Sequence, residues 1–381
     1  MLPQSNSPDT PEAREYNRIK RRLTMADLLL NFLFLIALLA AGWNGMLRDW
    51  ALQLSGQGYL LAVFFYVVML LVISKVLGLG LDFYSFRLEH QFNLSNQKLK
   101  SWLWDELKGW LIGLVIATIL VEMIYNVIRV APFKWWVIVW IVYNGLAIFF
   151  AQIAPVVLFP LFYKFKPLEN DDLRKRLVAL SERAGTRVRG VYEWKLSEKS
   201  KKANAALAGL GATRRIILAD TLLENFTPDE IEAVLAHELG HHVHKHILKS
   251  IVLQVGISLV GFWVVAQVLE YAVDHSLFSL TDRLYDFASL PLLVLMTTLM
   301  SFLLMPILNA YSRQKEREAD RYSLKSIREV GPFISSMNKL ADQNLAEREP
   351  SRLVEIWFHS HPPVGKRIAA AQAWANQHGV S

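Results

Sequence analysis

Six long apolar segments divide the chain, and stretches rich in charged and polar residues separate them. A helix that spans the hydrocarbon core of a membrane needs about 20 mostly apolar residues, because it rises about 1.5 Å per residue. Each segment is about that long, so the pattern predicts six transmembrane helices. Their approximate ranges are 25–43, 59–79, 111–130, 135–162, 251–273 and 290–308.

Two of these segments carry further signals. Pro155 and Pro160 lie in the fourth, and proline removes a helical hydrogen bond, so we expect this helix to kink or end early. Basic residues precede the first segment, as in a signal peptide, but its apolar run exceeds the usual length of about 7–15 residues. The first segment is therefore predicted to be an uncleaved membrane helix.

Charge places the polar parts of the chain relative to the membrane. An even number of spans puts the N-terminus and the polar segments after the fourth and sixth spans on one side. Lys and Arg gather on that side, which the positive-inside rule predicts to be cytoplasmic. The expected divisions are an N-terminal tail, four membrane helices with their loops, a cytoplasmic segment, two further membrane helices and a C-terminal segment, at 1–24, 25–163, 164–250, 251–310 and 311–381.

The amino-acid composition limits the kinds of site that the chain can form. The 381 residues include no cysteine, and 53% of them are hydrophobic. A disulfide framework, a thiolate metal site and a cysteine nucleophile are therefore excluded, so any metal must be held by His and carboxylates. The formal net charge of +7 is compatible with nucleic-acid binding, but the basic residues follow membrane topology instead of forming a binding stripe. We expect no nucleic-acid partner.

The strongest motif runs from Thr227 to His241. Thr227 is a suitable N-cap, Pro228 suits the first helical position, and Glu230 completes a capping box. The segment is therefore predicted to begin a helix at this point. His237 and His241, four residues apart, project from the same side of that helix.

This histidine pair indicates a zinc site. Two imidazoles at that spacing bind one zinc ion, and Glu238 lies beside them to take a proton from a water molecule. Zinc lowers the pKa of a bound water from 15.7 to about 7. The alternative is an amphipathic helix whose His and Glu residues face solvent.

A third protein ligand must come from elsewhere in the chain. Directly after the sixth span, Glu316 and Asp320 lie four residues apart. On a helix, one of them can bind zinc while the other accepts the free ring N–H of a histidine ligand. The alternative is a charged helix that leaves the membrane, because basic residues surround both carboxylates.

Together these motifs resemble the integral-membrane zinc metallopeptidases of the type I CAAX prenyl endoprotease family (Ste-type), which share a thermolysin-like site of two His and one Glu. The resemblance covers most of the chain from about Leu60 onward. It rests on the segments 89–93 with Asp105, 153–155, 166–168, 204–205, 215–223, 237–241, 312–320, and 361–363 with Arg367.

The resemblance implies that the zinc ligands are His237, His241 and Glu316. Glu238 is then the general base, and Asp320 is the hydrogen-bond partner of a ligand. The implied fold is an all-α polytopic membrane protein whose helices form a chamber-like barrel, with a gluzincin-like metallopeptidase domain that contains a small β-sheet.

The resemblance also gives roles to residues outside these motifs. His361 is implied to donate a hydrogen bond to the oxyanion, with Arg367 near the same pocket, whereas the His-Pro-Pro sequence alone favours a surface turn. Asn204 and Ala205 resemble an edge strand that pairs with the substrate backbone. Companion strands are predicted at 189–196 and 215–219.

Other ionisable residues are given lesser roles. His242, His244 and His246 are expected on the same helix as His241 but off its ligand face, and we interpret them as interfacial or as partners of ligands. Lys75 and Glu122 lie within spans, where they either line a chamber or, as is favoured for Lys75, reach an interface.

The sequence thus predicts an integral-membrane zinc endopeptidase with one Zn²⁺ per chain, which cleaves a peptide or protein substrate, lipidated or membrane-associated, at the cytoplasmic face. One alternative is a quality-control protease with an HtpX-like role. Another is a channel or transporter with a structural metal, which Glu238 argues against because a structural site needs no general base. Six spans, against seven in eukaryotic members, favour a bacterial inner-membrane protein.

Overall fold

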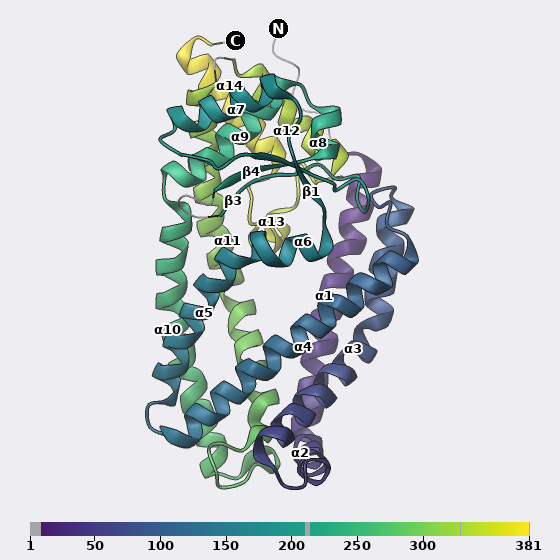
Figure 1. The fold of residues 1–381 in the computed structure, drawn as a ribbon, viewed down its shortest axis with the longest axis vertical. Helices are drawn as coiled ribbons and strands as arrows, with labels where there is room; N and C mark the ends of the chain where they lie inside the picture. Colours follow the sequence, from purple (N-terminus) through teal and green to yellow (C-terminus); the bar gives the residue numbers. More distant parts are fainter. Residues whose placement is uncertain (1–8, 210–213, 328, 381) are drawn as a thin grey trace.

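A computed structural model describes residues 9–209, 214–327 and 329–380. These residues form an elongated molecule, with long helices at one end and a cap of shorter helices and a small sheet at the other (Figure 1). The helices of the long part are α1 (Pro11–Ala40), α2 (Trp43–Leu54), α3 (Tyr59–Gln91), α4 (Leu99–Val130), α5 (Trp135–Ile153), α6 (Phe159–Phe162), α10 (His246–Asp274) and α11 (Leu290–Ser326). The elements of the cap are β1 (Phe165–Pro167), α7 (Asp171–Arg183), β2 (Val191–Trp194), β3 (Ala205–Ala208), β4 (Arg215–Ala219), α8 (Asp220–Asn225), α9 (Pro228–Val243), α12 (Gly331–Gln343), α13 (Arg352–Phe358) and α14 (Val364–His378).

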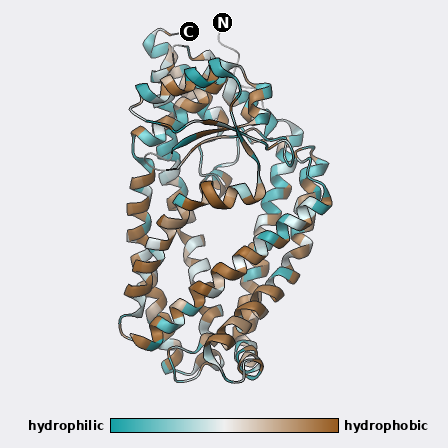
Figure 2. Cartoon of the chain, in the orientation of Figure 1, coloured by the Kyte–Doolittle hydropathy of each residue, from teal (hydrophilic) through white to brown (hydrophobic). Residues whose placement is uncertain are grey.

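The long part is built to lie in lipid. Six helical stretches of the described chain are long and apolar enough to cross a membrane, which confirms the predicted number of spans. Val115, Val252 and Ile307 each expose more than half of their surface on these helices. Exposed apolar surface of this extent is costly in water but favourable against acyl chains. Figure 2 shows the contrast between the hydrophobic helices and the more hydrophilic cap.

Several membrane helices continue past their apolar segments into the cap. Helix α1 begins at Pro11, where the Thr10 side chain caps it, and α11 runs without interruption to Ser326. The sixth span and the carboxylate motif at 312–320 are therefore parts of one helix. The fourth span becomes irregular where the sequence analysis expected it, because α5 ends in a π-helical turn over Ala154–Leu158.

Lys75 is paired within the protein. Its ammonium group lies 2.6 Å from a carboxylate oxygen of Asp82 and 2.5 Å from one of Glu106, so it joins α3 to α4. Both carboxylates lie toward the cap ends of their helices. The charge of Lys75 is therefore balanced by carboxylates of the protein itself.

The cap contains the predicted small sheet, with strand order β1-β2-β4-β3. Strands β2 and β4 are parallel, whereas β1 and β3 are antiparallel to their neighbours. Leu177 of α7, Leu218 of β4 and Leu235 of α9 belong to one buried cluster, so both helices pack against the sheet. Within the described part of the chain, β3 pairs with β4 alone, and Ala205 is its first residue, directly after Asn204. Its other edge lies beside the end of α9 that carries the histidines, because Ala205 and Leu207 line hollows shared with that end of α9.

Candidate active site

Helix α9 begins at the predicted capping box. Thr227 Oγ1 accepts a hydrogen bond from the Glu230 N–H (3.4 Å), and Glu230 Oε2 accepts one from the Thr227 N–H (2.7 Å). The Glu230 carboxylate also accepts from Lys339 Nζ (2.7 Å) and from Ser335 Oγ (2.5 Å) of α12. One carboxylate therefore caps α9 and fixes its direction relative to α12, which confirms the predicted helix start.

Helix α9 touches α11 at Gly240. A Cβ at this position would lie 2.9 Å from Ala319 Cα and 3.1 Å from Tyr322 Cβ. Real Cβ atoms do not approach other atoms so closely, so only glycine allows the two helices this contact. The histidines that flank Gly240 on α9 are thereby brought beside the carboxylates that flank Ala319 on α11.

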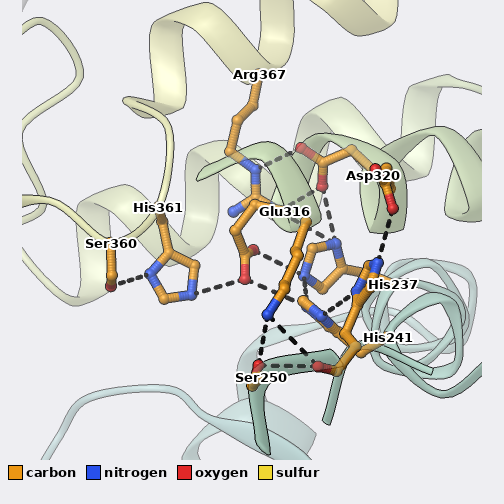
Figure 3. A network of polar contacts seen from close by, with 11 residues as sticks. His237, His241, Ser250, Glu316, Asp320, Ser360, His361 and Arg367 are labelled. Carbon is orange, nitrogen blue, oxygen red and sulfur yellow. Dashed lines mark hydrogen bonds and ion pairs between the residues drawn. The ribbon is translucent and has the colours of Figure 1, made fainter. Parts of the chain in front are cut away.

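Three side chains converge at this contact (Figure 3). His237 Nε2 and His241 Nε2 lie 3.2 Å apart, and Glu316 places one oxygen 3.2 Å from the former and the other 3.3 Å from the latter. Glu316 Oε2 is buried and accepts no hydrogen bond from the described residues. Two bare imidazole nitrogens and a carboxylate within 4.8 Å of one another form a donor set suited to a metal ion.

Asp320 and Arg367 lie behind this group. Asp320 Oδ1 is 2.8 Å from His237 Nδ1, which keeps the ring proton on Nδ1 and leaves Nε2 free as a ligand. Arg367 donates two hydrogen bonds to the Asp320 carboxylate, at 2.9 and 2.5 Å. Arg367 therefore holds Asp320 in place, with its Nη2 3.3 Å from His237 Nδ1.

The environment shifts the pKa of two neighbouring groups on α9. Burial disfavours the charged form of His237, but in the metal-free site the carboxylates of Asp320 and Glu316 outweigh it and raise the pKa of His237 to about 9, so a cation that binds at Nε2 must displace the second ring proton. Burial raises the pKa of Glu238, against the effect of the imidazoles of His237 and His241. A carboxyl group whose pKa moves toward neutrality is better able to accept a proton and return it.

A hollow lies on each side of Glu238. One is lined by Asn204, Ala205 and His361, and the other by Leu207 and the ligand-side residues of α10 and α11. Strand β3 thus runs from the first hollow to the second with its free edge along the site. An extended peptide can add to such an edge through main-chain hydrogen bonds.

His361 stands at the mouth of the site. Its side chain is 62% exposed, and its Nε2 is 3.4 Å from Glu316 Oε1. The Ser360 hydroxyl lies 3.0 Å from His361 Nδ1 and orients the ring. The structure therefore brings together every site residue named from the sequence, although 124 positions separate His237 from His361.

Comparison with known proteins identifies the family. A profile described as peptidase family M48 matches residues 167–375, more than half of the chain. The chain belongs to peptidase family M48. A second profile, described as CAAX prenyl protease N-terminal, five membrane helices, matches residues 5–164.

Relatives of this M48 protein occur in bacteria and eukaryotes. The uncharacterized metalloprotease YhfN of Bacillus subtilis is 31% identical over 96% of this chain and 85% of its own. CAAX prenyl protease 1 of Saccharomyces cerevisiae is 25% identical over 94% of this chain and 84% of its own. The crystal structure of S. mikatae Ste24p has the same fold, with a TM-score of 0.85, 23% identity and coverage of 97% of this chain and 91% of that one. The chain is therefore an integral-membrane metalloendopeptidase.

One histidine near the M48 site was predicted on the wrong helix. His246 does not continue the helix of His241, because α9 ends at Val243 and α10 begins at His246. Between them Lys245 has a φ of +55°, a left-handed conformation that interrupts the helix. His246 Nδ1 consequently lies 3.0 Å from His241 Nδ1. No glycine or proline lies at this turn, so it could not be predicted from the sequence.

Gly240 provides a first test of how the M48 site is assembled. Gly240→Ala should push α9 from α11 and separate the histidines from Glu316, with a loss of about 1–3 kcal/mol of stability, as for other overpacked sites. We expect a lower melting temperature and a lower metal content than in the wild-type protein. Gly256→Ala in α10 is the matched control, because its Cβ would meet nothing within 4 Å. Equal metal contents in both variants would contradict the close-contact role of Gly240.

Proposed function

We propose that this protein is a zinc-dependent endopeptidase in which His237, His241 and Glu316 hold one Zn²⁺ ion. The observation that carries the proposal is the convergence of these three ligand atoms within 4.8 Å. Glu238 is the residue directly after the ligand His237 in the sequence. Its side chain lines both hollows of the cleft, where a general base is needed.

The ligand spacing fits zinc. Tetrahedral coordination with bonds of about 2.0–2.1 Å places neighbouring ligand atoms about 3.3 Å apart. The two histidine Nε2 atoms lie 3.2 Å apart, and each lies 3.2–3.3 Å from one of the two Glu316 oxygens, His237 from Oε2 and His241 from Oε1. With one ligand atom taken from each residue, the three atoms lie within 4.8 Å of one another. The buried Glu316 Oε2, which receives no hydrogen bond from the described residues, gains a partner when a cation binds.

The chain's own residues account for the proton transfers. Zinc bound by these ligands supplies a Lewis acid that lowers the pKa of water and polarises a carbonyl group. Glu238 accepts the proton of the attacking water and returns it to the leaving amine. His361 donates a hydrogen bond to the oxyanion, for which its exposed position beside Glu316 is suited. Arg367 supports the same pocket by holding Asp320 against His237.

The cleft accommodates an extended peptide. Asn204 precedes β3 and Ala205 begins its free edge, so a substrate strand paired there passes Glu238 and reaches the second hollow. That hollow is lined partly by apolar residues at the cap ends of the membrane helices, namely Ile247, Leu253 and Leu308. An apolar wall at membrane level supports a substrate that is membrane-associated or lipidated. The relatives named CAAX prenyl proteases agree with such a substrate class.

The catalytic parts, 164–250 and 311–381, are proposed to face the cytoplasm. The distribution of Lys and Arg favours this orientation under the positive-inside rule. The relative in Bacillus subtilis supports a bacterial source for this protein. Its proposed location is therefore the bacterial inner membrane.

A substrate trap tests the proposal. Glu238→Gln is immobilised in detergent, and the proteins that it retains from solubilised membranes are identified by mass spectrometry. We expect enrichment of lipidated polypeptides over the Glu224→Gln control, whose exposed side chain lies on α8 away from the cleft. Retention of misfolded membrane proteins without lipid would indicate a quality-control protease instead. Equal retention by both variants would contradict substrate binding at this cleft.

A further inference from the structure

The imidazole of His246 lies directly behind His241. Besides the contact between their Nδ1 atoms at 3.0 Å, His246 Nε2 is 2.9 Å from Glu318 Oε2. The side chain of His246 is 3% exposed and that of Glu318 is 30% exposed, so water has little access to the His246 ring. Glu318, His246 and His241 therefore form a line that ends on the ring edge of His241 opposite its ligand atom.

When His241 binds a cation through Nε2, only one placement of the ring protons gives each contact in this line a donor and an acceptor. The ring proton of His241 is then on Nδ1 and is donated to His246 Nδ1. A His246 ring that accepts at Nδ1 must carry its own proton on Nε2, where Glu318 accepts it. Each donor faces an acceptor, and the arrangement is the one that leaves His241 Nε2 free for zinc.

The backbone is shaped to make this contact. On one continuous helix, residues five apart point about 140° away from each other, so His241 and His246 would not meet. The left-handed Lys245 breaks the helix and turns His246 back toward His241. Lys315 of α11 then donates hydrogen bonds to the His246 carbonyl and to Ser250 Oγ, which fixes the start of α10. Strained backbone of this kind is concentrated at functional sites.

The two histidine ligands therefore have separate supports. Asp320 orients His237, as the 2.8 Å contact shows. We infer that His246, held by Glu318, is the corresponding positioning residue for His241 and fixes the ring orientation and tautomer in which it binds zinc. This inference rests on the proposed zinc site and adds to it His246, which lies outside the two ligand motifs, and its partner Glu318.

Two variants of nearly equal size test the role of the His246 acceptor. Leucine has no acceptor, whereas the Asn Oδ1 occupies about the position of His246 Nδ1 and accepts from His241. The zinc Kd of the full-length protein in detergent is measured by competition with a chelator of known affinity. We expect His246→Leu to raise the zinc Kd by about 10–100-fold, as for other lost partners of metal ligands. His246→Asn should stay within about threefold of the wild-type protein, with melting temperatures of the metal-free proteins alike.

The control is His244→Leu, because the His244 ring stacks on His246 at 5.5 Å but lies outside the hydrogen-bonded line. It should leave the zinc Kd unchanged. The inference is overturned if His246→Leu binds zinc as tightly as the wild-type protein, or if Leu and Asn at this position weaken binding equally. Failure of the wild-type protein to bind zinc would overturn the proposed function itself, which separates the two outcomes.

Discussion

Glu238→Gln is expected to abolish peptide hydrolysis and to leave zinc bound. Glutamine has the shape of glutamate but cannot accept the proton of the attacking water. General acid–base groups contribute about 10²–10⁴-fold to rate, so kcat should fall by about 10³-fold or more. Zinc content should stay near one per chain, because none of the three proposed ligands is altered. The measurement pairs kcat on a peptide substrate with elemental analysis of the same sample.

The Glu224→Gln variant serves as the matched control, since it makes the same chemical change on the exposed face of α8. It should hydrolyse the peptide at the wild-type rate. A Glu238→Gln enzyme whose kcat stays within tenfold of the wild-type value would rule out Glu238 as the general base.

Glu316→Ala is expected to lose the metal and therefore the activity. Loss of a partner of a metal ligand alone costs about 10–100-fold in metal affinity, so loss of a ligand should raise the zinc Kd by more than about 100-fold. This variant differs from Glu238→Gln, which loses hydrolysis with zinc in place. The zinc Kd by chelator competition distinguishes them.

The control for Glu316→Ala is Glu329→Ala, which removes an exposed carboxylate beyond the end of α11. The melting temperatures of the metal-free variants separate an effect on zinc from an effect on folding. Tight zinc binding by Glu316→Ala, equal to that of the control, would show that the third ligand lies elsewhere.

The elements that sequence predicts best are those decided by strong local forces. Lipid requires long apolar helices with internally satisfied backbone groups, so the six spans were visible in the hydrophobic pattern. The capping box of Thr227 and Glu230 depends on residues three apart and was also visible. The candidate metal ligands could be named from the sequence because zinc chemistry requires particular side chains at helical spacing.

Other features depend on contacts between distant parts of the chain. Helix α2 was not predicted, because its fixed position depends on Asn44, whose amide donates to the carbonyls of Phe278 and Ala288 more than 200 residues away. The turn at Lys245 contains no glycine or proline, so it depends on tertiary packing and not on a local sequence signal. The role of Gly240 became apparent only when α9 was seen against α11.

The continuity of α11 links the membrane to the site. This helix carries Pro291 and Leu292 at the far end of the last span and Glu316 and Asp320 in the cap. Glu316 and Asp320 of the proposed metal site therefore lie on a membrane helix, whereas His237 and His241 lie on the cap helix α9. Their contact at Gly240 joins the two parts of the enzyme.

The central claim is that zinc held by His237, His241 and Glu316 enables Glu238 to catalyse peptide hydrolysis. The most direct test is a titration of Zn²⁺ into the metal-free wild-type and Glu238→Gln proteins, with zinc binding and peptide hydrolysis measured at each step. The account predicts that both proteins bind one equivalent and that hydrolysis rises in proportion only in the wild-type protein. Hydrolysis by the wild-type protein without zinc, or equal hydrolysis by both proteins at one equivalent, would contradict it.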